Sequence, residues 1–79
     1  MTAFPHFYRC LGETIRTNRK KAAVSQMVLA ERAGVTRRFI QELENGRSNI
    51  SLHTLMRLSA ALGMTLSDMC AQIETALKS

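Results

Sequence analysis

Apolar residues recur every three or four positions through most of this chain, with polar residues between them. Such spacing gathers the apolar side chains on one face of an α-helix, and strand-like alternation is found nowhere. Phe7, Leu11 and Ile15 predict a first helix that starts near Pro5, a residue suited to a first helical turn. Residues 1–5, ahead of this helix, are expected to form a flexible arm.

Cap residues and glycines divide the remainder into further helices. Residues suited to cap a helix N-terminus precede four segments: Ser25, Thr36, Ser51 and Thr65. Glycines that can end a helix follow three of them: Gly34, Gly46 and Gly63. The pattern therefore predicts helices over 26–33, 36–44, 52–62 and from 66 onward.

The expected inward faces define one small core. For the second helix we expect Met27, Leu29 or Ala30, and Ala33 to point inward. The fourth helix offers a wide apolar face of Leu52, Leu55, Met56, Leu58, Ser59 and Leu62. The fifth presents Leu66, Met69, Cys70, Ile73 and Leu77 on one side. A chain of 79 residues forms one domain, so the predicted fold class is all-α, a compact five-helix bundle over residues 6–79.

The second and third predicted helices carry the residue pattern of a DNA-binding helix-turn-helix. Ala30 is small where the next helix crosses closely, and Gly34 can adopt positive φ in the turn. Val35, Ile40 and Leu43 are expected to face inward and to fix the crossing angle. The side chains left outside would face a DNA major groove: Arg37, Arg38, Gln41, Glu42 and Asn45.

The charge supports a polyanionic partner. The formal net charge is +5 and the isoelectric point is about 10.0. Duplex nucleic acid is the favoured partner, and an anionic membrane surface is the alternative. No apolar run approaches the ~18 residues of a membrane helix, and no signal-peptide segment follows Met1, so we expect a cytoplasmic protein.

Neither a metal site nor a catalytic site is predicted. Cys10 and Cys70 are far apart and show no zinc-ligand spacing, so we expect free thiols that fill a core. His6 and His53 are isolated. Without a nucleophile–base set, paired carboxylates or a phosphate-cradling glycine loop, the sequence indicates no enzyme and no cofactor.

The whole organisation resembles the phage-repressor/Cro family of lambda-repressor-like DNA-binding domains. The matching segments are 11–19, 25–30, 33–36, Ile40, 43–46 and 51–62. This resemblance implies dimeric binding to inverted-repeat operators and control of transcription. Within the family, residues 47–52 and the short last helix look like restriction–modification controller proteins, and also like small antitoxin-type repressors. The chain departs from the family at 21–24, where a Gly is usual, and at Val28, where a Glu commonly completes the capping box.

The resemblance also implies roles for single residues. Gln26, at the start of the second helix, would bind a phosphate through its backbone N–H and its side-chain amide. Arg19 and Glu44 would form a partly buried structural ion pair, which removes Arg19 from the expected DNA contacts.

The third helix leaves several interpretations open. Arg37 and Arg38 can each read a guanine or touch only phosphate. Because cations are disfavoured at a helix N-terminus, two arginines there are better explained by binding to a partner than by the stability of the helix. Glu42 can accept a hydrogen bond from N4 of cytosine, or it can orient Arg38, four residues earlier, as an ion pair. We favour this second role, the steering of Arg38. Phe39 can lie against sugar or a thymine methyl, or pack on the rim of the domain. Gln41 can touch a base edge or phosphate, or simply be exposed. Candidate phosphate contacts flank the helix: Thr36, Asn45 and Arg47.

Apolar residues of the last helix predict a homodimer. Leu66 and Met69 can close the bundle, whereas Ile73, Ala76 and Leu77 are expected to extend past its edge. The expected dimer interface comprises Leu66, Met69, Ile73, Ala76 and Leu77. A two-fold axis would bury that patch against itself.

Three functions compete on this basis. The favoured one is a sequence-specific transcription regulator. An antitoxin that mainly neutralises a toxin is the alternative, and a basic RNA- or membrane-binding domain is the third. An activator would also need a surface for RNA polymerase, for which Glu13, Glu31 and Glu42 are candidates.

Overall fold

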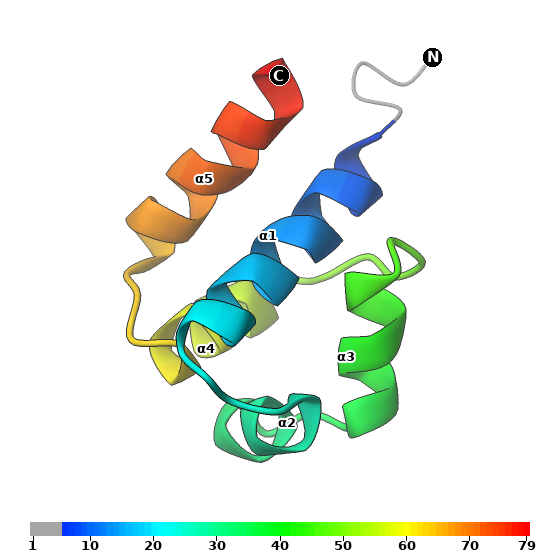
Figure 1. The fold of residues 1–79 in the computed structure, drawn as a ribbon, viewed down its shortest axis with the longest axis vertical. Coiled ribbons are helices and arrows are strands. Elements are labelled where there is room, and N and C mark those ends of the chain that lie inside the picture. The colour runs from blue at the N-terminus through cyan, green and yellow to red at the C-terminus, as the bar shows by residue number, and fades with distance from the viewer. Residues whose placement is uncertain (1–5) are drawn as a thin grey trace.

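A computed structural model describes residues 6–79, which form five α-helices and no strand. The helices are α1 (Phe7–Lys21), α2 (Gln26–Ala33), α3 (Arg37–Glu44), α4 (Leu52–Ala61) and α5 (Leu66–Lys78) (Figure 1). The predicted all-α, five-helix fold class is confirmed. The arm expected over residues 1–5 lies outside the described residues. Within those residues, no helix is both long enough and apolar enough to cross a membrane.

Every predicted N-cap makes its hydrogen bond. In each case a hydroxyl oxygen accepts the backbone N–H three residues later, which satisfies a donor that the helix itself leaves free. The pairs are Ser25 with Val28 at 3.1 Å, and Thr36 with Phe39, Ser51 with Thr54 and Thr65 with Asp68 at 3.0 Å. The polar residues that break the apolar pattern therefore set where α2, α3, α4 and α5 begin.

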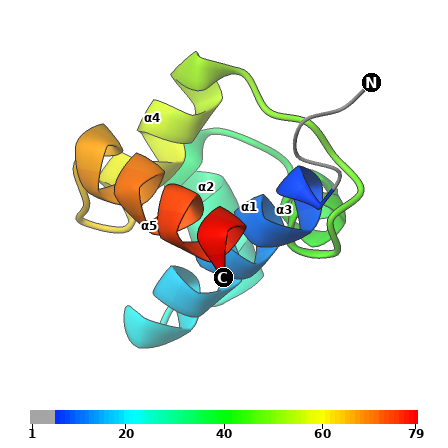
Figure 2. The same cartoon turned by 90° about the horizontal axis from the view of Figure 1, so that it is seen from above.

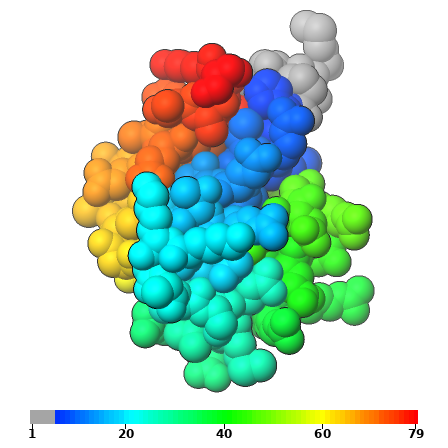
Figure 3. All heavy atoms as spheres, in the orientation of Figure 1, coloured from blue at the N-terminus to red at the C-terminus, as the bar shows by residue number. Residues whose placement is uncertain are grey.

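Helix α1 runs through the middle of the domain. It packs against α3 on one side and α5 on the other, while α2 packs against α3 and α4 (Figures 1 and 2). The space-filling view shows the surface of α1 between those of α5 and α3 (Figure 3). The recognition-helix candidate α3 is thus held mainly by α1 and α2.

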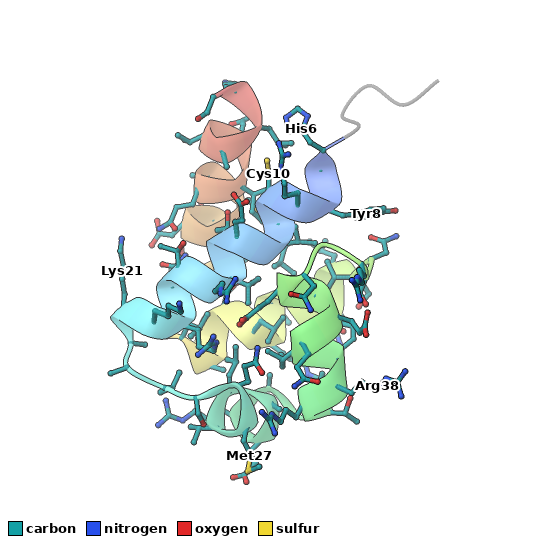
Figure 4. The ribbon with its side chains drawn as sticks, turned by 45° about the vertical axis from the view of Figure 1, so that its right-hand side comes forward. His6, Tyr8, Cys10, Lys21, Met27 and Arg38 are labelled. Carbon is teal, nitrogen blue, oxygen red and sulfur yellow. The ribbon has the colours of Figure 1, made fainter. Side chains whose placement is uncertain are left out.

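All five helices contribute to one hydrophobic core. Its buried residues are Leu11, Ile15, Leu29, Ala30, Ala33, Ile40, Leu43, Leu55, Leu58, Met69 and Ile73. Three large apolar side chains expected to face inward are instead exposed: Met27 at 54%, Leu52 at 67% and Met56 at 46%. Met27 points away from the domain because the inward face of α2 runs through Leu29, Ala30 and Ala33 (Figure 4).

The two thiols have different surroundings. Cys10 is buried in the first turns of α1, as expected, but Cys70 is exposed on α5. The prediction that both fill a core is therefore wrong for Cys70. Met69 and Ile73 supply the buried contacts of that helix, and Cys70 lies at an exposed position beside them.

Gly12 lets α1 cross the end of α3 at very short range. A Cβ atom built on Gly12 would collide with the carbonyl oxygen of Leu43 and lie 3.0 Å from that of Glu44. Only a residue without a side chain fits at this crossing. The close approach fixes the C-terminal end of α3 against the body of the domain.

The connection between α1 and α2 contains the departure from the family pattern. Ala23 adopts φ 58°, the left-handed conformation that glycine takes without steric cost. Arg19 donates a hydrogen bond from Nη1 to the carbonyl of Val24 at 3.1 Å, which holds this connection against α1. The path of the chain is therefore kept without the usual glycine.

Candidate nucleic-acid interface

The turn between α2 and α3 has the geometry of a helix-turn-helix. Gly34 ends α2 in the left-handed conformation, with φ 70° and ψ 35°. The N–H of Val35 then donates to the carbonyl of Ala30 at 3.0 Å, a bond that closes the end of α2. Thr36 caps α3 immediately afterwards, so the chain turns from one helix into the next within three residues. Both ends of the turn are fixed by hydrogen bonds rather than by packing alone.

One face of α3 is buried and the opposite face is exposed. Ile40, Leu43 and Glu44 are buried. Exposed residues predicted to face DNA are Arg37, Arg38, Gln41 and Asn45, and Arg47 is exposed just beyond the helix. Arg38 extends away from the domain in Figure 4. The helix therefore presents a polar, cationic stripe on a rigidly held backbone.

Two other residues of α3 are less accessible. Phe39 is half-buried and packs against the core, which corresponds to the rim-packing interpretation. Glu42 is half-buried as well, and its carboxylate forms no ion pair with Arg38 within 4.0 Å. The favoured steering role of Glu42 is therefore wrong in this structure. An exposed pair of this spacing is worth only ~0.3–0.5 kcal/mol, less than the cost of ordering a long Arg side chain.

Arg19 and Glu44 form the ion pair that the resemblance implies. Arg19 Nε lies 2.6 Å from Glu44 Oε2, and Arg19 Nη2 lies 3.0 Å from Glu44 Oε1. The side chain of Glu44 is 2% exposed and that of Arg19 is 12% exposed. The hydrogen bond to Glu44 raises the pKa of the Arg19 guanidinium above its ordinary value, although burial opposes the shift. The pair joins the end of α3 to the last turn of α1.

Gln26 is part of this ion-pair network. Its side-chain Nε2 donates to Glu44 Oε1 at 3.1 Å, so the amide is held between the start of α2 and the end of α3. The first helical hydrogen bond of α2 runs from the N–H of Leu29 to Ser25, which leaves the N–H groups of Gln26 and Met27 outside the helical ladder. Such groups, at the positive end of a helix dipole, bind anions.

A shallow hollow of about 450 Å³ joins these elements. It is lined by Arg19, Ser25, Gln26, Met27 and Arg37, which belong to α1, to the start of α2 and to the start of α3. The N-terminus of α2 and the first turn of α3 therefore open onto the same surface. This surface can accommodate an anionic backbone beside the exposed stripe of α3.

Residues of α5 differ from their expected roles. Met69 is fully buried, as expected of a residue that closes the bundle, and Ile73 is 6% exposed, so neither offers much surface to the predicted dimer interface. Leu66, Ala76 and Leu77 are half-buried. The expectation that Ile73 lies exposed is wrong, because it packs into the core that α5 shares with the other helices. An apolar groove of about 400 Å³ remains beside it, lined by Phe7, Leu55, Cys70, Ile73, Glu74, Leu77 and Lys78.

Sequence reasoning missed Gly12 and Arg57. Gly12 showed no local signal beyond its place in a helical segment. Arg57 interrupts the apolar face of α4, and its three hydrogen bonds reach the end of α2, 23 and 24 positions earlier in the chain. No periodicity in the sequence could reveal that partner. Elsewhere in residues 6–79, no three His, Cys, Asp or Glu side chains gather as a metal site would require.

Comparison with known proteins identifies the family. A family model described as helix-turn-helix matches residues 15–69. The chain belongs to the helix-turn-helix family of DNA-binding regulators. The resemblance drawn from the sequence is thereby confirmed.

Two sequence relatives are similar over most of this chain. The immunity repressor protein of Bacillus phage phi105 is 35% identical over 68 residues, covering 86% of this chain and 46% of the repressor. This chain therefore spans about half the length of that relative. The control protein C.MunI from Mycoplasma sp is 38% identical over 64 residues, covering 80% of this chain and 86% of C.MunI.

Solved structures have the same fold. The clp gene regulator ClgR from Corynebacterium glutamicum superimposes with a TM-score of 0.88 at 28% identity, covering 95% of this chain and 80% of ClgR. The restriction-modification controller protein C.AhdI from Aeromonas hydrophila superimposes with a TM-score of 0.76 at 27% identity, covering 78% of this chain and 94% of C.AhdI.

Proposed function

We propose that this chain binds duplex DNA sequence-specifically, as a homodimer on inverted-repeat operators, and regulates transcription from them. The observation that carries the proposal is the exposed stripe of Arg37, Arg38, Gln41 and Asn45 along α3, whose opposite face is fixed in the core. The major groove of B-DNA, about 12 Å wide, admits such a helix. An Arg fork at its first turn matches the O6 and N7 acceptors of guanine.

Groups around α3 would contact the DNA backbone. The free N–H groups of Gln26 and Met27 suit one phosphate, and the hydroxyl of Thr36 can donate to another while its oxygen caps α3. Asn45 and Arg47 are exposed at the far end of the helix. Such contacts fix the position of a protein on the duplex without reading its sequence.

The homodimer follows from the limited reach of one helix. A single α3 contacts too few base pairs to select a site in a genome, so two copies must act together. We place the second copy on the apolar groove beside α5, next to Leu77 and Cys70. Glu74 and Lys78 also line this groove, and opposite charges can pair across a two-fold axis. Because α5 and α3 lie on opposite sides of α1, this interface leaves both recognition helices uncovered (Figure 1).

For the biological setting we favour control of a restriction–modification system. The similarity to C.MunI and C.AhdI supports it. The content of the neighbouring genes tests it, since a methyltransferase and an endonuclease are expected there. A neighbouring toxin gene would instead favour the antitoxin-type repressor.

Selection of bound sequences from a random duplex pool tests the proposal. We expect enrichment of one short half-site repeated in inverted orientation, with centres about 10 base pairs apart on one face of the DNA. A pool that shows no enrichment would contradict sequence-specific binding. Enrichment of a single, unrepeated half-site would contradict the homodimer.

A further inference from the structure

The guanidinium of Arg57 holds the turn that leads into the recognition helix. Arg57 lies on α4, is half-buried, and donates from Nε and Nη2 to the carbonyl of Ala33 at 2.8 and 2.6 Å. Its Nη2 also donates to the carbonyl of Gly34 at 2.9 Å. The last carbonyls of a helix have no partner within the helix, and a cation there also interacts favourably with the helix dipole. One side chain of α4 therefore provides hydrogen-bond donors to the carbonyls of Ala33 and Gly34 at the end of α2.

This contact bears directly on where α3 points. Helix α3 packs mainly against α1 and α2, so the rest of the domain acts on it through those two helices. The Arg19–Glu44 pair and the Gly12 crossing fix its C-terminal end. The N-terminal end of α3 is set by the turn before it, because Arg37 comes three residues after Gly34, whose carbonyl Arg57 binds.

Arg57 itself is poorly placed to touch DNA. It binds the C-terminal end of α2, whereas the N–H groups of Gln26 and Met27, proposed above to bind one phosphate, are at the N-terminal end, about 12 Å away for a helix of eight residues. Its Nε and Nη2 donors are already directed at backbone carbonyls. While the turn is held in this way, those two donors are not available to a phosphate.

We propose that Arg57 is a positioning residue for sequence readout: it holds the α2–α3 turn against α4, so that Arg37 and Arg38 meet the base edges in alignment. The inference rests on the proposed DNA-binding function. Alignment matters because bidentate Arg–guanine contacts require both N–H donors to meet their acceptors at once. Loosening the turn should therefore reduce discrimination between sequences more than it reduces attraction to DNA in general.

The test compares wild-type protein with Arg57→Met, Arg57→Lys and the control Arg32→Met. Arg57→Met keeps an apolar stem but removes the fork, and Arg57→Lys keeps the charge without it. Arg32 is an exposed cation of α2 and, together with Arg57, lines a second surface hollow between the end of α2 and α4, so its variant removes one charge from the same region. Each protein is titrated with the duplex selected by the wild type and with a scrambled duplex, over a range of salt, after urea melts establish where it is folded.

For folded Arg57→Met we expect about tenfold to a hundredfold weaker binding to the selected duplex. A loss of this size corresponds to the misalignment of one or two bidentate Arg–guanine contacts. Binding to the scrambled duplex and the salt slope should stay near wild type, and Arg32→Met should keep the full sequence preference. Arg57→Lys should also lose preference, which keeps the test informative if Arg57→Met does not fold.

Two results would overturn the positioning role. Folded Arg57 variants that retain the wild-type preference would show that the residue acts on stability alone. Equal weakening on both duplexes, with a shallower salt slope, would show a phosphate contact. A wild-type protein that binds both duplexes equally is a separate result, since it would contradict the proposed function and the positioning role with it.

Discussion

The carboxylate of Glu44, the last residue of α3, accepts two hydrogen bonds from the guanidinium of Arg19 in the last turn of α1. The same carboxylate accepts a third bond from the amide of Gln26 at the start of α2. One buried side chain therefore joins the three helices that surround the proposed DNA surface. The relationship makes the ion pair part of the frame that holds the recognition helix, rather than a DNA contact.

Removing either partner should damage folding. Glu44→Ala leaves the Arg19 guanidinium without its partner, and Arg19→Ala leaves a carboxylate that is 2% exposed without its cation. Breaking a buried pair in this way typically costs ~3–5 kcal/mol of unfolding free energy. Urea melts of both single variants and the double variant check this, and the double variant should lose less than the sum of the singles. Strictly additive losses would show that the two residues are not coupled.

Ala23→Gly should stabilise the domain. Ala23 has φ 58°, and an L-residue in this region costs roughly 1–2 kcal/mol. Glycine removes that cost, but it also gives the unfolded chain more conformational freedom, which lowers the unfolding free energy by ~0.4–1 kcal/mol. A net gain of about 0.5–1 kcal/mol in unfolding free energy is therefore expected. The matched control is Ala22→Gly, at φ −77°, which should lower stability. A thermal or urea melt compares the two, and equal effects would contradict the strain at Ala23.

The local signals in the sequence predicted much of this fold. Ser25 and Thr36 cap their helices because a cap depends only on residues within one turn, and Gly34 ends α2 for the same local reason. The pattern of small and apolar residues also predicted the helix-turn-helix, since each position of that motif has its own steric requirement.

The remaining features depend on distant neighbours. Met27 and Ile73 both lie in apolar stripes, but only the packed bundle determines that Met27 is exposed and Ile73 buried. Arg57 contacts a turn more than 20 positions away. Glu42 and Arg38 have the spacing of an ion pair and do not form one. Periodicity gives the faces of a helix, whereas the order of the helices in space decides which face is covered.

The proposed dimer interface predicts different outcomes for two residues of α5. Leu77→Glu places a charge in the apolar groove on a half-buried residue and should give a monomer in analytical ultracentrifugation with a modest loss of stability. Ile73→Ala should mainly lower the unfolding free energy, by ~2–4 kcal/mol, because Ile73 belongs to the core. Ala71→Glu, at an exposed position of α5 outside the groove, is the charge control. A Leu77→Glu protein that stays dimeric would place the interface elsewhere.

Binding should depend strongly on salt. With a net charge of +5 per chain, a dimer that neutralises about 6–8 phosphates should give a log–log slope of about −5 to −7. Arg47→Ala should make this slope shallower by about 2, one phosphate per protomer, and weaken all sequences about equally. Fluorescence anisotropy titrations between low and high salt measure both quantities. A slope near zero on the selected duplex would contradict the electrostatic contribution.

The base preferences of Arg37→Ala, Arg38→Ala and Arg47→Ala, selected from one random duplex pool beside the wild type, test most directly whether α3 reads DNA. At least one of the first two variants should lose preference at one base pair in each half-site, with a loss of ~1–3 kcal/mol on the wild-type site. Arg47→Ala should keep the wild-type consensus, because a phosphate contact carries no sequence information. If Arg37→Ala and Arg38→Ala both retain the complete wild-type consensus, neither arginine of α3 reads a base and the recognition surface lies elsewhere.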